Sequence, residues 1–364
     1  MSRIAISFCV VTFLFISMNP SLLFAQRNKT KPAVTSLSNV DQNYYYQGEY
    51  SGSISIPVRP YPWKHIGFQV VALGSGQFAG VAYTGGLPGS GWNRRDRENF
   101  TGQLQNGAIW FPGKPYSYLV EGHSIMVYDS TERPLGQLPK VSRVSQTLGL
   151  HPPWGSAVLF NGTNTEHLKN GRMTFDGLLK EGADFMESYG DFSLHLEFRL
   201  PYMPDARGQA RSNSGVYLQS RYEVQILDSF ALEGENNECG GLYKQRKPDL
   251  NMCFPPLTWQ TYDIDFTAPR FDANEKRMRK ARLTVWHNGV LIHNNVELEN
   301  KTGGGKKEGP NSLPTNLQDH SNPVRFRNIW VAEHDKPIGI PSPQIHNQPD
   351  RNHHFAIKRA HWLY

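Results

Sequence analysis

The sequence is poor in cysteine and contains no nucleotide-binding signature. Only three of its 364 residues are cysteines, and Cys9 lies inside an apolar N-terminal stretch, which leaves Cys239 and Cys253. A zinc site needs three or four ligands at suitable spacing, and two isolated cysteines do not supply them. No glycine-rich dinucleotide fingerprint is present, so the sequence predicts no NAD-binding site.

The excess of positive charge is too small to indicate a polyanionic partner. The chain has 38 Lys and Arg against 32 Asp and Glu, and removal of residues 1–25 would leave 37 against 32, a net charge of +5. The densest basic run, residues 276–282, follows a loop-like segment and is typical of the solvated rim of a hairpin. No helix-turn-helix or zinc-finger motif accompanies it, so we expect no nucleic-acid partner.

Residues 1–25 have the composition of an export signal. Arg3 precedes an uncharged apolar stretch from Ile4 to Met18, and Ala25 offers a cleavage site. The alternative is an uncleaved membrane anchor, but the stretch is short for a bilayer span. We therefore expect an exported protein, periplasmic or extracellular, with no membrane association once the signal is removed.

Two cysteines in an oxidising compartment predict one disulfide, between Cys239 and Cys253. It would close a loop of about 15 residues and contribute about 3 kcal/mol if unstrained. An acidic loop follows Asp228, and calcium there is an open alternative. The acids of this loop are Glu233, Glu235 and Glu238. Because they do not follow the spacing of a calcium loop, no cofactor or metal is predicted.

Glycine and proline are abundant, and apolar residues alternate with polar ones over short stretches. The 33 glycines and 25 prolines favour many short strands over long helices. Hairpin turns are predicted at residues 74–76 and at Asn288-Gly289. We predict an all-β protein with these parts: a linker (26–45), a small N-terminal β domain without a catalytic cluster (46–150), a β-sandwich or jelly roll (155–335) and an irregular tail (336–364).

Three predicted strands of the sandwich carry polar side chains on the face opposite their apolar residues. Residues 192–200 place Glu197 and Arg199 on one face, because alternate residues of a strand share a side. Residues 214–219 likewise place Tyr217 on the polar face of their strand, and residues 222–228 place Glu223 and Gln225 on theirs. If the strands pair in sequence order, all these groups line one concave surface that could bind sugar hydroxyls, with Asn213 at its rim.

The last predicted strand brings further polar residues. Gln318, Asp319 and His320 precede the apolar alternation of residues 322–330. Asp319 either tunes the neighbouring His320 as a proton-transfer group or caps a turn, and the sequence leaves both open.

Five sequence blocks occur in an order and at a spacing that resemble the 3-keto-disaccharide hydrolase family: residues 190–199, 213–219, 222–228, 259–263 and 322–330. The resemblance covers roughly residues 155–333 and implies a concanavalin-like sandwich. The N-terminal β domain and the Cys239/Cys253 pair resemble the subset of this family found in planctomycete-type bacteria. Members of the family are assigned to cleavage of glycosides whose C3 hydroxyl has been oxidised to a ketone.

The resemblance implies a reaction that needs a base at C2, donors to the C3 oxygen and an acid for the leaving oxygen. From the shared strand faces we assign Glu223 as the base and Glu197 or His320 as the second proton carrier. The expected substrate-binding residues are Arg199, Asn213, Tyr217, Gln225, Gln318 and Asp319. A carbohydrate substrate and a separate sugar 3-dehydrogenase acting before this protein are the implied partners.

Two other functions stay open at this stage. A conventional glycosidase needs a second carboxylate near the first, but Gln225 stands two residues after Glu223, where laminarinase-type sandwiches place that acid. A carbohydrate-binding module is the non-enzymatic alternative, since a fold does not determine function.

Overall fold

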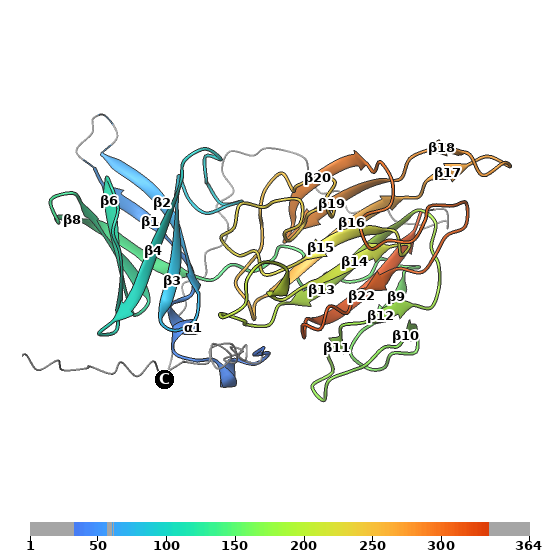
Figure 1. The fold of residues 1–364 in the computed structure, drawn as a ribbon, viewed down its shortest axis with the longest axis horizontal. Coiled ribbons are helices and arrows are strands. Elements are labelled where there is room, and N and C mark those ends of the chain that lie inside the picture. Colours follow the sequence, from blue (N-terminus) through green and yellow to red (C-terminus); the bar gives the residue numbers. More distant parts are fainter. Residues whose placement is uncertain (1–32, 57–59, 61, 335–364) are drawn as a thin grey trace, which may run out of the picture. The chain divides into compact units, whose positions relative to one another are not determined.

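The computed structural model describes residues 33–56, 60 and 62–334 (Figure 1). The predicted signal at 1–25 and tail at 336–364 lie outside these residues. In the described part, no helix has the length and apolar character needed to cross a membrane. The fold class predicted from the sequence is confirmed, because nearly all regular elements are strands.

The N-terminal β domain is a closed barrel of eight antiparallel strands in chain order, with β8 pairing back to β1. Its interior is filled by alternate residues, among them Tyr50, Phe68 and Phe111. The predicted hairpin at residues 74–76 connects β2 and β3. The strands are β1 (Gly48–Ser55), β2 (Trp63–Ala72), β3 (Gln77–Thr84), β4 (Arg97–Gln105), β5 (Ala108–Phe111), β6 (Tyr116–Glu121), β7 (Ser124–Asp129) and β8 (Pro134–Val141).

The segment before the barrel is more ordered than the linker predicted for residues 26–45. Its described part forms a short 3-10 helix, η2 (Leu37–Asn39), and one turn of helix, α1 (Asn43–Tyr46). Val34 pairs with Tyr202, and Tyr46 packs into the barrel core. The pairing of Val34 with Tyr202 and the buried Tyr46 that follows the segment hold these residues in place.

The larger domain stacks two sheets around one apolar core. A seven-stranded sheet contains β9 (Ala157–Phe160), β11 (Leu179–Lys180), β13 (Phe192–Arg199), β16 (Trp259–Thr267), β19 (Arg282–His287), β20 (Val290–Glu297) and β22 (Arg325–Glu333). A five-stranded sheet has the order β10 (Leu168–Lys169), β12 (Ala183–Phe185), β21 (Asn316–Leu317), β14 (Ser214–Leu218) and β15 (Tyr222–Ile226). Phe198 of the first sheet and Val224 of the second belong to the same buried cluster.

Two predicted turns of this domain are present. β17 (Arg270–Phe271) and β18 (Arg277–Arg279) form a two-stranded hairpin that carries the basic run. Two of its cations are paired with acids, since Arg277 contacts Glu308 and Lys280 contacts Glu299. Asn288 and Gly289 join β19 to β20 with positive φ values of 55° and 79°.

The expectation that Glu197 and Glu223 share one surface is wrong. Glu197 lies on β13 in the seven-stranded sheet, whereas Glu223 lies on β15 in the five-stranded sheet. The chain crosses from one sheet to the other between residues 199 and 214, so β13 does not pair with β14, the next strand in the sequence. β13 pairs instead with β16 and β22, which are distant in the chain.

Glu197 binds the segment around Gly149, which follows the barrel, and holds this segment on the outer face of β13. Its Oε1 accepts the Gly149 backbone N–H at 2.6 Å and the Asn328 amide at 3.0 Å, and its Oε2 accepts Arg327 Nε at 2.6 Å. Burial raises the pKa of Glu197, but donors from His195, Asn328, Gly149 and Arg327 outweigh it and lower that pKa to about 2. Glu197 is thus a permanently charged structural group.

His195 and Arg199 also lie on this outer face of β13 and make their contacts there. His195 Nδ1 lies 2.6 Å from Asp263 Oδ1, and its ring stacks on Trp330 at 5.2 Å. Burial lowers the pKa of His195, but the carboxylates of Asp263 and Glu197 outweigh it and raise that pKa above its usual value. Arg199 lies over the Trp259 ring at 5.0 Å and donates to the Thr35 carbonyl, so it contacts this face and not the site predicted for it.

The two remaining cysteines are buried free thiols, so the predicted disulfide is not present in the structure. Cys239 Sγ lies 3.2 Å from the Tyr262 hydroxyl, and Cys253 Sγ donates to the Leu227 and Phe254 carbonyls. Hydrogen bonds within a packed core satisfy both groups without a covalent bond.

Replacement of Glu197 by Gln should destabilise the protein by about 2–4 kcal/mol at pH 7, because Arg327 and His195 lose a buried charge partner. The stability that Glu197 contributes is present above pH 4.5, its ordinary pKa, and is lost as the pH falls toward its folded pKa of about 2. Urea unfolding of wild type and variant at pH 7 and pH 3 measures both effects.

The matched control is Glu297→Gln on β20, which removes an exposed ion pair with Arg282 from the same sheet. We expect a loss below about 1 kcal/mol there. Equal losses in the two variants would contradict the structural role of Glu197.

Candidate functional site

The five-stranded sheet turns a polar face away from the core. On β14 and β15 alternate residues such as Val216 and Val224 enter the core. Tyr217, Glu223 and Gln225 therefore point to the other side, as the sequence alternation predicted. β14 and β15 pair as a hairpin with Tyr217 directly opposite Glu223.

A row of directly opposed residues crosses all five strands on this face. Starting from β15 it consists of Glu223, Tyr217, Asn316, Asp184 and Lys169, and we call it the polar row. Its members become more accessible along the row, since Glu223 is buried and Lys169 is exposed. The row therefore leads from open sheet surface to an enclosed carboxylate.

The Glu223 side chain fits against β14 because residue 215 is glycine. A Cβ atom on Gly215 would lie 2.5 Å from Glu223 Oε1 and 3.1 Å from its Cγ. No larger residue at position 215 leaves room for the carboxylate in this position.

Two neutral donors hold the Glu223 carboxylate. The Tyr217 hydroxyl donates to Oε2 at 2.7 Å. The Gln225 amide takes the orientation that places its nitrogen 2.8 Å from Oε1, because the opposite orientation would turn its oxygen toward the carboxylate. Burial raises the pKa of Glu223 to about 7, although the Tyr217 hydrogen bond lowers it. No ion pair to Glu223 is found among the described residues, so it can exchange a proton near neutral pH.

The Tyr217 hydroxyl lies between the Glu223 carboxylate and the side chain of Gln318. Burial raises the pKa of its hydroxyl, and the negative charge of Glu223 adds to the effect, so Tyr217 remains protonated at neutral pH. Gln318 Nε2 lies 3.5 Å from the Tyr217 oxygen, and its backbone N–H donates to the Gly215 carbonyl. The Gln318 side-chain oxygen is buried and has no hydrogen-bond partner in the described part of the chain, which leaves one acceptor available.

Asn213 and Gln209 form the rim beside Gln225. Asn213 donates from its amide to the Gln209 carbonyl at 2.9 Å, and its backbone N–H donates to the Asn322 side chain at 2.7 Å. Gln209 was not predicted, because it lies in the irregular crossing between the two sheets, where no strand alternation marks it.

A glycine-rich loop covers the closed end of the row. Thr302 accepts the Glu223 backbone N–H at 2.8 Å through its hydroxyl. A Cβ on Gly304 would lie 2.9 Å from the Tyr217 oxygen, so the loop can approach Tyr217 this closely only because residue 304 is glycine. Sequence reasoning missed these residues and Asp184, although the Thr-Gly-Gly-Gly run at 302–305 and the alternation of residues 183–185 were visible signals.

Asp319 and His320 follow Gln318 but do not form a proton-transfer pair. Asp319 Oδ1 accepts the Ser321 backbone N–H at 2.8 Å, which identifies Asp319 as the cap of a turn. His320 is exposed, two residues beyond Gln318. Of the alternatives left open for Asp319, the structure thus favours the turn.

The acidic loop after Asp228 is occupied by protein contacts. Asp228 pairs with Arg211 at 2.6 Å, Glu233 pairs with Arg97, and Glu238 accepts two backbone N–H groups. Within residues 33–56, 60 and 62–334, no group of three or more His, Cys, Asp or Glu side chains is arranged to hold a metal ion.

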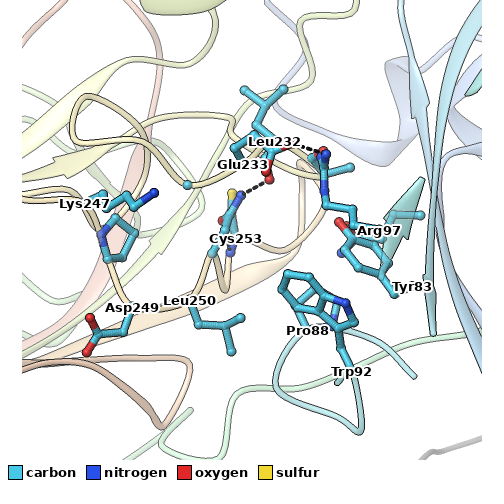
Figure 2. Close-up of a pocket in the computed structure, with 15 residues that line it drawn as sticks. Tyr83, Pro88, Trp92, Arg97, Leu232, Glu233, Lys247, Asp249, Leu250 and Cys253 are labelled. Atoms are coloured by element: carbon cyan, nitrogen blue, oxygen red, sulfur yellow. Dashed lines mark hydrogen bonds and ion pairs between the residues drawn. The ribbon is translucent and has the colours of Figure 1, made fainter. Parts of the chain in front are cut away.

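A cavity of about 200 Å³ lies apart from the polar row (Figure 2). Figure 2 shows Tyr83 and Trp92 on one side of it, and Leu232, Lys247 and Cys253 on the other. Its lining contains Cys253 but none of the other predicted site residues. The candidate catalytic groups therefore lie on the sheet face and not in this cavity.

Comparison with known proteins finds one family model that is similar to the larger domain. Residues 155–332, just under half of the chain, match the model of the 3-keto-alpha-glucoside-1,2-lyase-like domain. No curated protein matches.

Solved structures from Parabacteroides distasonis, described as a "putative glycosyl hydrolase", are similar to part of the chain. One is 29% identical and covers 50% of this chain and 84% of its own, with a TM-score of 0.45. Another is 21% identical and covers 49% and 98%, with a TM-score of 0.36. Residues 155–332, which are similar to this family model, contain the whole polar row.

Proposed function

We propose that the larger domain cleaves the glycosidic bond of 3-keto-glycosides or 3-keto-disaccharides, with Glu223 as the base. The observation that carries this proposal is a buried carboxylate with a pKa of about 7 on the polar face of a domain of this family. A general base is most effective when its pKa lies near the working pH.

The ketone at C3 makes this chemistry accessible to a single base. It acidifies the hydrogen on C2, so Glu223 removes that proton and the electron pair forms an enolate at the C3 oxygen. The ketone then re-forms as the bond between C1 and the leaving oxygen breaks, which leaves a double bond between C1 and C2. The leaving oxygen takes up a proton, and addition of water to the double bond makes the net reaction a hydrolysis.

The neighbours of Glu223 supply the donors that an enolate needs. Tyr217 and Gln225 donate to the Glu223 carboxylate in the absence of substrate, at 2.7 and 2.8 Å. With substrate bound, the protonated Tyr217 hydroxyl donates to the C3 oxygen, where negative charge develops. Gln318 and Asn213 bind the remaining hydroxyls, and the accessible half of the polar row receives the rest of the glycoside.

The second proton carrier cannot be Glu197. It lies on the other sheet, and its pKa of about 2 leaves it without a proton to donate at neutral pH. Arg199 lies on that same outer face and is equally remote from Glu223. His320, on the accessible segment after Gln318, is the group we assign to protonate the leaving oxygen.

A conventional two-carboxylate glycosidase is disfavoured by the spacing of acids on this face. Such enzymes place their carboxyl groups about 5–9.5 Å apart. The other acid of the polar row, Asp184, lies three strands from Glu223, or about 14 Å at the usual strand spacing. A simple carbohydrate-binding face is also disfavoured, because the one aromatic residue of the row, Tyr217, is buried.

The purified protein should cleave 3-keto-trehalose and leave trehalose intact, because only the ketone acidifies C2. Glu223→Gln should reduce the rate by about 10²- to 10⁴-fold, since the base is removed. Product release followed by chromatography measures both. Glu197→Gln makes the same chemical change on the other sheet and should keep the wild-type rate per folded molecule. Cleavage of trehalose would instead support an ordinary glycosidase, and no cleavage of either sugar a binding module.

Activity should rise with pH through about 7, because Glu223 acts only as the carboxylate. Below that value kcat/KM should fall about tenfold per pH unit. A pH profile on the 3-keto substrate tests this, and a profile that stays flat from pH 5 to 8 would remove Glu223 as the base.

The same ionisation should lower stability. Because its folded pKa is raised above 4.5, Glu223 contributes stability that is complete below pH 4.5 and lost as the pH rises through about 7. At pH 8 the variant Glu223→Gln should be more stable than wild type by up to about 3 kcal/mol, and this advantage should vanish at pH 4. Urea titrations at the two pH values provide the measurement.

Gly215→Ala should reduce activity at least about tenfold, because the added methyl group displaces the Glu223 carboxylate. We expect an accompanying loss of about 1–3 kcal/mol in stability. Gly190→Ala is the matched control, since no atom lies within 4 Å of a Cβ built there. Wild-type activity in folded Gly215→Ala would contradict the proposed position of the base.

A further inference from the structure

An uncharged band crosses the outer surface of the N-terminal barrel. Directly opposed residues on six consecutive strands form it: Gln77, Gln103, Trp110, Leu119, Met126 and Gln137. Their strand neighbours Phe78, Ile109 and Phe111 point into the barrel core. The band therefore faces solvent across β3 to β8 and makes no contribution to the barrel interior.

A groove of about 690 Å³ lies over the β3–β6 half of this band. Its walls include the side chains of Gln77, Thr101, Gln103, Gln105, Trp110 and Leu119, and no Asp, Glu, Lys or Arg is among its lining residues. A groove of this size falls within the range of about 300–1,000 Å³ that ligand sites occupy.

Trp110 is the largest side chain in the groove. It is 41% exposed, and its ring lies 5.8 Å from that of Tyr128 on β7. An aromatic residue exposed on the outer face of a strand is not needed for the core, and such a patch commonly marks a binding surface. Its flat apolar ring can pack against the C–H face of a sugar.

The polar residues around Trp110 can hydrogen-bond the hydroxyl groups of a sugar. Each Gln amide carries two donors and an acceptor, and the Thr101 hydroxyl both donates and accepts, which suits vicinal hydroxyl groups. The absence of cationic side chains from the lining disfavours nucleic acids and acidic polysaccharides, whose binding requires neutralisation of charge.

We propose that this face of the barrel binds a neutral polysaccharide chain, with Trp110 as the stacking residue and Gln77 and Gln103 as hydroxyl ligands. This site is independent of the polar row and gives the N-terminal domain a function of its own. The barrel then holds the protein on a glycan from which substrates of the larger domain are released.

Affinity gel electrophoresis tests the proposal with four probes cast in the gel: dextran, laminarin, hydroxyethyl cellulose and dextran sulfate. At least one of the three neutral polysaccharides should retard the wild-type protein. Trp110→Ala should weaken that retardation at least about tenfold in apparent Kd, as expected for a central aromatic anchor. Gln103→Ala should weaken it by a smaller factor.

The matched control is Trp63→Ala, which removes another exposed tryptophan of the barrel, 65% accessible on β2 and outside the band. It should bind as wild type, and circular dichroism should show all variants folded. The proposal is overturned if no neutral polysaccharide retards the protein, if only dextran sulfate does, or if Trp63→Ala and Trp110→Ala lose binding equally. Because Glu223→Gln should still bind and Trp110→Ala should still cleave 3-keto-trehalose, failure here is distinguishable from failure of the proposed activity.

Discussion

The arrangement of the candidate site depends on one close contact, that of the Glu223 carboxylate with the bare backbone of Gly215. Packing of the two sheets fixes Val216 and Val224 in the core, so the residues directly before and after each valine in its strand point to the other face. On that face the missing side chain at position 215 opens the space into which Glu223 folds. Burial there raises the pKa of the carboxyl group to about 7, and the neighbouring Tyr217 and Gln225 hold it without neutralising its charge.

Glu197, the second buried carboxylate, has a pKa shifted in the opposite direction from that of Glu223. Both glutamates lie on strands with the same alternation, and both are nearly inaccessible. Burial raises the pKa of Glu197, but His195, an amide, a backbone N–H and a guanidinium outweigh it and lower that pKa to about 2, whereas Glu223 has only neutral donors. Charged donors make a carboxylate a permanent structural anion, and their absence makes it a group that exchanges protons.

The two β domains of the chain use their strands for different purposes. In the larger domain the accessible sheet face carries carboxylate, hydroxyl and amide groups in one row, which suits acid–base chemistry. On the barrel the corresponding outer band is uncharged and is dominated by Trp110 and glutamine side chains. Our two proposals together describe a chain that holds a neutral glycan on one domain and acts on 3-keto sugars with the other.

The sequence alone determined the features that arise from local pairing. Period-2 alternation, frequent turns and five motif blocks were enough to predict an all-β fold and a 3-keto-disaccharide hydrolase-like domain. Tyr217, Glu223 and Gln225 share a face as predicted because β14 and β15 form a tight hairpin, in which register follows from a short turn.

Only the tertiary structure decided which strands meet. Alternation assigns a residue to one side of its own strand but does not assign that strand to a sheet. For this reason Glu197 and Arg199 lie on the opposite sheet, and Asn316 and Asp184 complete the row from distant parts of the chain. The low pKa of Glu197 depends on the same long-range packing, because its donors Gly149, Arg327 and Asn328 come from distant parts of the chain.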